Sequence, residues 1–248
     1  IDPYISIKDN EARINLRIID SQENLRRNDL INKINYDLKN KIKLKDDEFK
    51  LAGVLILFNN LLQSLFKSQI LTLGLVMADQ GFSIYGLDKD KKLIAQLKNK
   101  EAPFHEKGIE HYINKHVNKS LKIGSDEEII NSDIYIITVG TPINNISKKP
   151  EVKNILEAAS IIGKKLKKND LVVLRSTVPI GCTRKIVIPK LEEVSKLSTG
   201  KDFSVAFCPE RISQGNGIKE LKNLPQIISA SNIKTYKTCE KIFKSLTK

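Results

Sequence analysis

Two short runs of almost uninterrupted apolar residues constrain the fold of this chain more than any other feature. One run, IYIITV, covers 134–139, and the other, LVVL, covers 171–174. Strands of this kind are buried on both faces of a parallel sheet, because a half-exposed strand would alternate polar and apolar residues. Shorter apolar runs predict four more strands, over Ser83–Leu87, Leu121–Gly124, Phe203–Phe207 and Gln226–Ser229.

Helical segments lie between these runs, and their spacing indicates the topology. The sequence predicts them over Leu71–Gln80, Lys91–Lys98, Glu106–Lys115, Val152–Leu166, Thr183–Lys196 and Lys237–Leu246. Because strands and helices alternate, we expect right-handed crossovers between parallel strands. The expected class is therefore α/β, with a Rossmann-like, doubly wound, mainly parallel sheet that carries helices on both faces.

The first fifty residues differ in character from the rest. Residues 1–50 are polar, mixed in charge and rich in Asn and Lys, which predicts an extension that is disordered or holds short helices, around Glu23–Lys41. An apolar stretch begins at Leu51, and we expect one globular domain over 51–248.

The net charge of the chain is high, and its distribution decides what it means. There are 42 Lys and Arg against 29 Asp and Glu, for a formal net charge of +13. The excess is dispersed, without an arginine-rich stripe or a basic motif interleaved with aromatic residues, so we expect a solvated surface and no nucleic-acid partner. An anionic small ligand fits the same charge.

Signals for membranes, secretion and metals are missing from the sequence. No apolar run approaches 18 residues, and no basic-then-apolar leader follows Ile1. Cys182, Cys208 and Cys239 are scattered and match neither a disulfide framework nor a metal motif. We therefore expect a cytoplasmic protein with no membrane partner and no metal site.

The segment GLDKD places an acidic residue, Asp88, at the end of a predicted strand. In a dinucleotide-binding fold, an acid at this point accepts hydrogen bonds from the adenine ribose and favours NAD over NADP. The same Asp can also simply end a strand in a turn. The glycine-rich loop that should lie one helix upstream is missing, because 65–70 reads LFKSQI where GxGxxG would cradle the pyrophosphate.

Small and hydroxyl-bearing residues follow two of the buried strands. Gly140, Thr141 and Pro142 come after the first, and Ser176 and Thr177 after the second. Ligands approach an open α/β sheet at the carboxyl ends of its strands, so these hydroxyl groups are candidates to hold a cofactor amide or a water molecule. They could equally stabilise turns.

A further strand ends at Cys208 and delivers Glu210 and Arg211 to the same edge. A carboxylate beside a guanidinium can act as an acid, a base or a water-orienting group with an anion-binding partner. The alternative is an ordinary ion pair on the surface.

Five segments between Leu71 and about Ala230 carry a more specific signal: GLDKD, EAPFHEKGIE, VGTP, RSTVPIGCT and CPER…LPQII. In their order and spacing they resemble the UDP-glucose/GDP-mannose dehydrogenase family. The PER form is similar to the branch that acts on UDP-N-acetylhexosamines such as UDP-N-acetylmannosamine. The resemblance implies oxidation of a UDP-sugar to its uronic acid with two NAD, through a cysteine-linked intermediate.

The resemblance also implies roles for individual residues. Asp88 would bind the adenosine ribose, and the cofactor cleft would be lined by Val139, Gly140, Thr141, Pro142, Ser176 and Thr177. Thr177 would also help to hold the water and the substrate, as a catalytic residue. Glu210 would be the catalytic carboxylate, and Glu210 and Arg211 would contact the substrate.

Departures from the family pattern limit what this chain is expected to do. In the family, the nucleophilic Cys, the catalytic Lys and the dimerisation and UDP-binding domains follow the NAD-binding portion, and no segment of this sequence resembles them. We therefore expect the chain alone to be inactive. The resemblance implies that full-length relatives are homodimers, through a domain not recognised here. Two alternatives stay open: a non-catalytic α/β scaffold that binds a UDP-sugar or a partner protein and, more remotely, a basic nucleic-acid binder.

Overall fold

The computed structural model describes residues 5–6, 11–15, 27–53, 71–104, 106–125, 128–144, 147, 149–212 and 216–247. The chain divides into two compact units, Ile1–Leu55 and Ile56–Lys248. In the first unit, strand β1 (Ile5–Ser6) pairs antiparallel with β2 (Glu11–Ala12), and helix α1 spans Arg27–Asn40. Helix α1 lies within the segment where the sequence predicts short helices.

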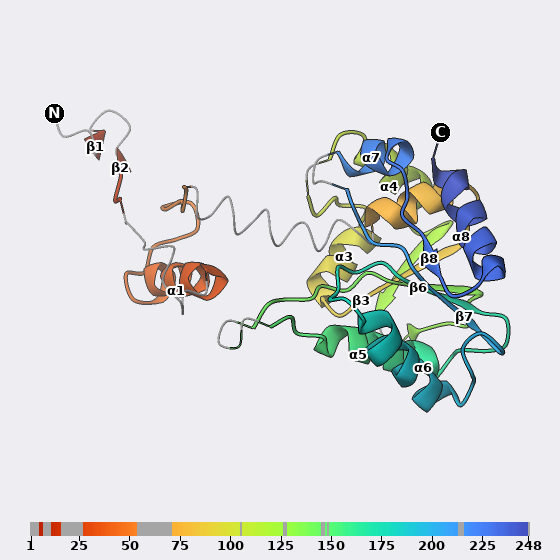
Figure 1. Cartoon of the computed structure of the whole chain (residues 1–248). Helices are drawn as coiled ribbons and strands as arrows, with labels where there is room; N and C mark the ends of the chain where they lie inside the picture. The colour runs from red at the N-terminus through yellow and green to blue at the C-terminus, as the bar shows by residue number, and fades with distance from the viewer. Residues whose placement is uncertain are drawn as a thin grey trace. The chain divides into compact units, whose positions relative to one another are not determined.

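The second unit is built on parallel strands, as the apolar runs predict (Figure 1). Strand β3 (Ile84–Asp88) pairs in parallel with β4 (Leu121–Ser125). A second ladder has the order β5-β6-β7-β8, in which the first three strands are parallel and the last is antiparallel. The strands of this ladder are β5 (Ile134–Ile137), β6 (Leu171–Leu174), β7 (Ser204–Phe207) and β8 (Ser229–Ala230).

Strand β6 shows why the sheet is covered on both faces. All four of its residues are buried, and they alternate between two hydrophobic clusters. Leu171 and Val173 pack into one cluster, whereas Val172 and Leu174 pack into the other, because successive side chains of a strand point to opposite faces. The prediction of a doubly wound α/β arrangement with buried strands is confirmed.

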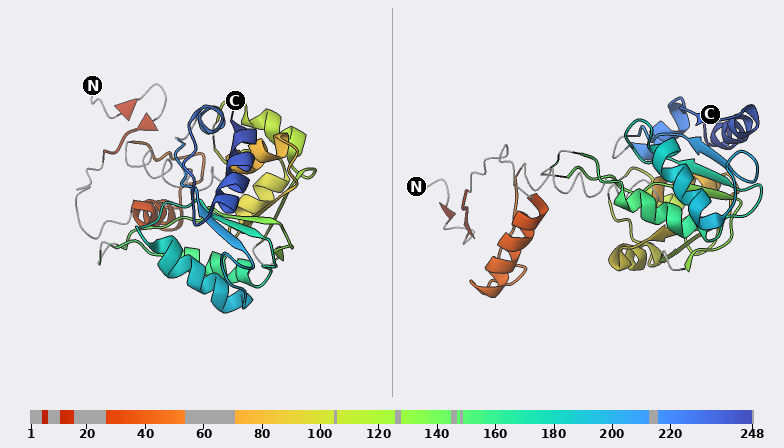
Figure 2. Two further views of the ribbon diagram at one scale, coloured as in Figure 1. Left: turned by 45° about the vertical axis from the view of Figure 1, so that its right-hand side comes forward. Right: turned by 60° about the horizontal axis from the view of Figure 1, so that its bottom comes forward.

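Each face of the sheet carries its own set of helices (Figure 2). One face is covered by α5 (Lys153–Gly163), the π-helical turn η2 (Thr183–Val187) and α6 (Ile188–Ser195). The other carries a helix over 71–79 and the helices α3 (Lys91–Lys98), α4 (Ile109–His116), α7 (Gly217–Asn223) and α8 (Ile233–Leu246).

The helix over 71–79 has an unusual environment. Its residues 71–78 are all buried, and its sequence, LTLGLVMA, is apolar on every side. A helix that is apolar all round lies inside a protein rather than on its surface. This helix belongs to the larger hydrophobic cluster, together with residues of α3, α4 and α8.

The structure differs from the sequence prediction in several boundaries. The strand expected over Gln226–Ser229 is instead the two-residue β8, which adds to the edge of the ladder in the antiparallel direction. Helix α8 begins four residues earlier than expected, because Asn232 caps it. Helix α7 was not predicted from the sequence.

Two sequence features lie wholly or partly outside the described residues. Of the apolar stretch that begins at Leu51, only 51–53 are described up to residue 70, and these residues are irregular. The positions 65–70, where the glycine-rich loop would be expected, are not described. Within the described part of the chain, no helix combines the length and the apolarity needed to cross a membrane.

Candidate functional site

Most of the residues singled out from the sequence lie where parallel strands end. Val139 to Pro142 follow β5, Arg175 to Thr177 follow β6, and Cys208 to Arg211 follow β7. Because β5, β6 and β7 are parallel neighbours, these three segments meet at the carboxyl edge of one ladder. This is the edge at which open α/β sheets bind ligands.

Asp88 is the last residue of β3, in the other ladder. Its Oδ1 accepts a hydrogen bond of 2.8 Å from the backbone N–H of Asp90, and its Oδ2 is bound by no described residue. Lys89, which comes next, forms an ion pair with Glu157 of α5. Since α5 begins soon after the loop that follows β5, this ion pair links the end of β3 to the second ladder.

Hydrogen bonds join the two hydroxyl-bearing loops. The Thr141 hydroxyl donates to the carbonyl oxygen of Thr177 at 2.6 Å, and the Ser176 hydroxyl donates to that of Val139 at 2.7 Å. The Asn154 amide donates to the carbonyl oxygen of Gly140 at 3.0 Å. The loops therefore form one connected surface.

These bonds divide the predicted cofactor residues into two groups. Ser176 is buried, and its hydroxyl serves the loop-to-loop contact rather than the solvent. Thr177 and Pro142 are exposed, and the Thr177 side chain is bound by no described residue. Of the three hydroxyl groups, that of Thr177 is therefore the one that is exposed and not engaged with a described residue.

The side chain of Glu210 is buried and forms its ion pair with Arg175, and not with its sequence neighbour Arg211. Its carboxylate is only 4% exposed and pairs with Arg175, whose side chain is 1% exposed. The guanidinium binds it in a bidentate manner, with 2.8 Å from Nε to Oε2 and 2.8 Å from Nη2 to Oε1. Oε1 also accepts from the backbone N–H groups of Arg211 at 2.9 Å and Ile212 at 3.3 Å.

The side chain of Arg211 points elsewhere and is exposed. Its Nη1 donates to the carbonyl oxygen of Pro225 at 3.3 Å, so it joins the segment after β7 to the segment before β8. The guanidinium partner of Glu210 is therefore Arg175 and not Arg211. Both carboxylate oxygens of Glu210 already have donors, so the group is held beneath the edge.

Two charged residues in this region were missed by sequence reasoning. Arg175 directly follows the buried run LVVL, and a cation at such a position requires an acidic partner inside the protein. Glu106 lies in the segment EAPFHEKGIE and is buried. Its carboxylate accepts from the backbone N–H of Ile218, at the start of α7. For Arg175, a charged residue directly after an apolar run was the available signal, whereas the charged segment around Glu106 gave none.

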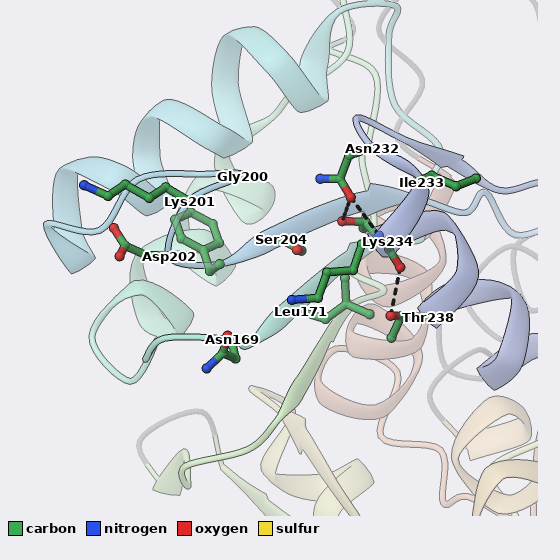
Figure 3. Close-up of a pocket in the computed structure, with 12 residues that line it drawn as sticks. Asn169, Leu171, Gly200, Lys201, Asp202, Ser204, Asn232, Ile233, Lys234 and Thr238 are labelled. Atoms are coloured by element: carbon green, nitrogen blue, oxygen red, sulfur yellow. Dashed lines mark hydrogen bonds between the residues drawn. The ribbon is translucent and has the colours of Figure 1, made fainter.

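A cavity of about 350 Å³ lies away from this edge. Figure 3 shows it near the first residues of β6 and β7 and the beginning of α8, so it opens at the amino ends of the strands. Its lining includes Asn169, Gly200, Lys201, Lys234 and Thr238, and none of the residues predicted for the site. Within the described residues, no three His, Cys, Asp or Glu side chains gather as metal ligands.

Comparisons with known proteins show which proteins this chain is similar to. The UDP-N-acetyl-D-glucosamine 6-dehydrogenase of Salmonella typhi is 32% identical over 164 residues, which are 66% of this chain and 38% of that protein. A UDP-N-acetyl-D-mannosamine dehydrogenase of Methanococcus aeolicus is 30% identical over 173 residues, covering 68% and 38%. The chain thus spans about two fifths of the length of these relatives.

Structural comparison gives the same result. The structure of the UDP-D-ManNAc dehydrogenase of Pyrococcus horikoshii superimposes with a TM-score of 0.67 and 28% identity, covering 72% of this chain and 42% of that one. Residues 71–247 match the model of the UDP-glucose/GDP-mannose dehydrogenase family, NAD binding domain. The chain therefore belongs to the UDP-glucose/GDP-mannose dehydrogenase family, and its residues 71–247 form the NAD-binding domain of that family.

Proposed function

We propose that this chain is the NAD-binding portion of a dehydrogenase that oxidises a UDP-N-acetylhexosamine, similar to UDP-N-acetylmannosamine, at C6 to its uronic acid. The connected loop surface at the carboxyl edge carries the proposal. Exposed Thr177 lies on it beside Thr141, in the position where a doubly wound fold receives its ligands. The N-acetylhexosamine substrate is supported by the names of two similar relatives.

The residues at this edge fit the adenosine and nicotinamide parts of NAD. Asp88 keeps one carboxylate oxygen available for ribose hydroxyl groups, and its charge disfavours a 2′-phosphate. Thr141, Pro142 and Thr177 would form the other wall of the proposed cleft. NAD, when bound, supplies the hydride acceptor, and the protein side chains bind and orient both ligands.

The sequence of the expected phosphate-binding turn lowers the affinity that we expect for NAD. Leu65, Lys67 and Ile70 stand where glycines let backbone N–H groups approach a pyrophosphate. We expect isothermal titration of the chain with NAD to give weak or no binding. The triple variant Leu65→Gly, Lys67→Gly, Ile70→Gly should recover it, and adding Asp88→Asn should weaken it again. Unimpaired binding by the unmodified chain would refute this account of the turn.

The sugar nucleotide can be tested without turnover. Saturation-transfer NMR with UDP-N-acetylmannosamine and UDP-glucose should show contact with the former and a weaker signal for the latter. Thr177→Val should reduce the contact, whereas Ile180→Val, at a fully exposed residue of the same loop, should not. Equal signals for both nucleotides, insensitive to Thr177, would rule out the proposed substrate class at this edge.

A second candidate is a non-catalytic scaffold that binds a UDP-sugar or a partner protein. The observation that favours it is the engagement of Glu210 with Arg175, which leaves the carboxylate no free oxygen for proton transfer. Saturation transfer from the UDP-sugar, together with absence of NAD binding by the glycine-restored variant, supports the scaffold. NAD binding by that variant argues against it.

A further inference from the structure

The side chain of Arg175 joins its own segment to three others that are far from it in the sequence. Besides Glu210, its Nη1 donates to the carbonyl oxygen of Cys208 at 3.4 Å and to Oε1 of Gln226 at 3.3 Å. Its guanidinium carbon lies 5.2 Å from the centre of the Phe243 ring, a cation–π contact with α8. The end of β6, the segment after β7, the segment before β8 and helix α8 therefore meet at one side chain.

The backbone of Arg175 also joins its segment to the neighbouring strands β5 and β7. Its carbonyl oxygen accepts from the N–H of Glu210 at 3.0 Å, and its N–H donates to the carbonyl oxygen of Ile137 at 2.9 Å. The next residue, Ser176, is bound to Val139, and the one after that, Thr177, emerges at the surface. The direction of Thr177 thus depends on how Arg175 is held.

We propose that Arg175 is the positioning residue of the carboxyl edge: pairing with Glu210, it fixes where Thr177 and Thr141 meet a ligand. This inference rests on the proposed function only for the identity of the ligand. In this arrangement Glu210 acts as the anchor of Arg175. A bidentate pair is suited to this because two parallel hydrogen bonds fix orientation as well as distance.

The test separates positioning from stability. Removing one partner of a buried ion pair leaves an uncompensated charge, whereas replacing both by apolar residues of similar volume is often tolerated. The double variant Arg175→Met, Glu210→Leu should therefore keep its helical circular dichroism. Its Thr141 and Thr177 methyl resonances, followed by ¹³C methyl NMR, should nevertheless shift or broaden. The matched control Lys190→Met, Glu193→Leu replaces an exposed ion pair of α6 and should leave both resonances in place.

If the double variant does not fold, Arg175→Lys decides the question. Lysine keeps the charge but cannot form two parallel bonds to one carboxylate, so the same two methyl resonances should move. Unchanged resonances in a folded variant of either kind would overturn the proposal.

Ligand titration gives the second readout. If the wild-type chain binds UDP-N-acetylmannosamine, we expect a folded Arg175 variant to bind it at least about tenfold more weakly, since misplacing one hydrogen-bonding group has an effect of this size. Undiminished affinity in such a variant would contradict the proposal. If the wild-type chain does not bind the nucleotide, the proposed function fails, while the methyl comparison still judges the role of Arg175.

Discussion

Glu106 and Ile218 are 112 residues apart in the sequence and are joined by a buried hydrogen bond from the Ile218 N–H to the carboxylate. The carboxylate also accepts from the N–H of Gly217 and lies beside the Thr72 hydroxyl. A Cβ atom added at Gly217 would lie 3.0 Å from Glu106 Oε2, a tight contact that glycine avoids. One acidic side chain thus holds the start of α7 against the buried helix 71–79.

Burial raises the pKa of the Glu106 carboxyl group, although its two backbone donors oppose the shift. Since the group binds its proton more tightly in the folded protein, its contribution to stability is greatest below its ordinary pKa. That contribution is lost as the pH rises through the raised native value. The variant Glu106→Gln stays neutral, so its stability relative to wild type should improve between pH 4 and pH 8, as measured by urea unfolding.

The control for this prediction is Glu110→Gln, which removes a negative charge from an exposed position of α4. It should change stability little over the same pH range. A Glu106→Gln variant that parallels wild type at every pH would contradict the prediction. Glu106→Ala should lower the free energy of unfolding by about 2 kcal/mol, since it leaves buried N–H groups without an acceptor.

Helix α7 illustrates what the sequence could not reveal. Its segment GIKELKN has little helical periodicity, and the acceptor for its first N–H groups comes from a distant part of the chain. Strands β5 and β6, by contrast, were predictable because burial on both faces leaves a continuous apolar run. The candidate site could likewise be predicted only in part. The sequence located the strand ends, but it suggested Arg211 as the partner of Glu210, whereas the partner in the structure is Arg175.

Gly163, at the end of α5, packs directly against Val194 of α6. A Cβ atom at Gly163 would lie 2.8 Å from the Val194 Cβ, which is closer than two such atoms approach. Gly163→Ala should therefore lower the free energy of unfolding by about 1–2 kcal/mol, because overpacking outweighs the gain in helix propensity. The cost should be smaller in a Val194→Ala background. Additive effects in this double-mutant cycle would argue against the contact.

Asn232 determines where α8 begins. Its Oδ1 accepts from the backbone N–H of Thr235 at 2.8 Å and from the Thr235 hydroxyl at 2.9 Å. Asn232→Ala should cost about 1 kcal/mol in urea unfolding, whereas Asn232→Asp keeps an acceptor and should cost much less. Ser231→Ala, at the exposed preceding residue, serves as the control. Equal losses for the Ala and Asp variants would show that the side-chain cap is unimportant.

All three cysteines of the chain are buried, and none is placed as a nucleophile. A hydrogen bond with the Cys239 thiol and burial raise the pKa of Cys208, and burial raises that of Cys182. The same hydrogen bond lowers the pKa of Cys239, but this thiol is fully buried and out of reach of a reagent. At pH 8, Ellman's reagent should therefore label no thiol of the native protein within minutes, and three in guanidinium chloride. Rapid labelling of one thiol in the native state would contradict this. Because formation of a covalent sugar–enzyme intermediate needs an accessible thiolate, the expected result also means that these cysteines cannot carry out that step.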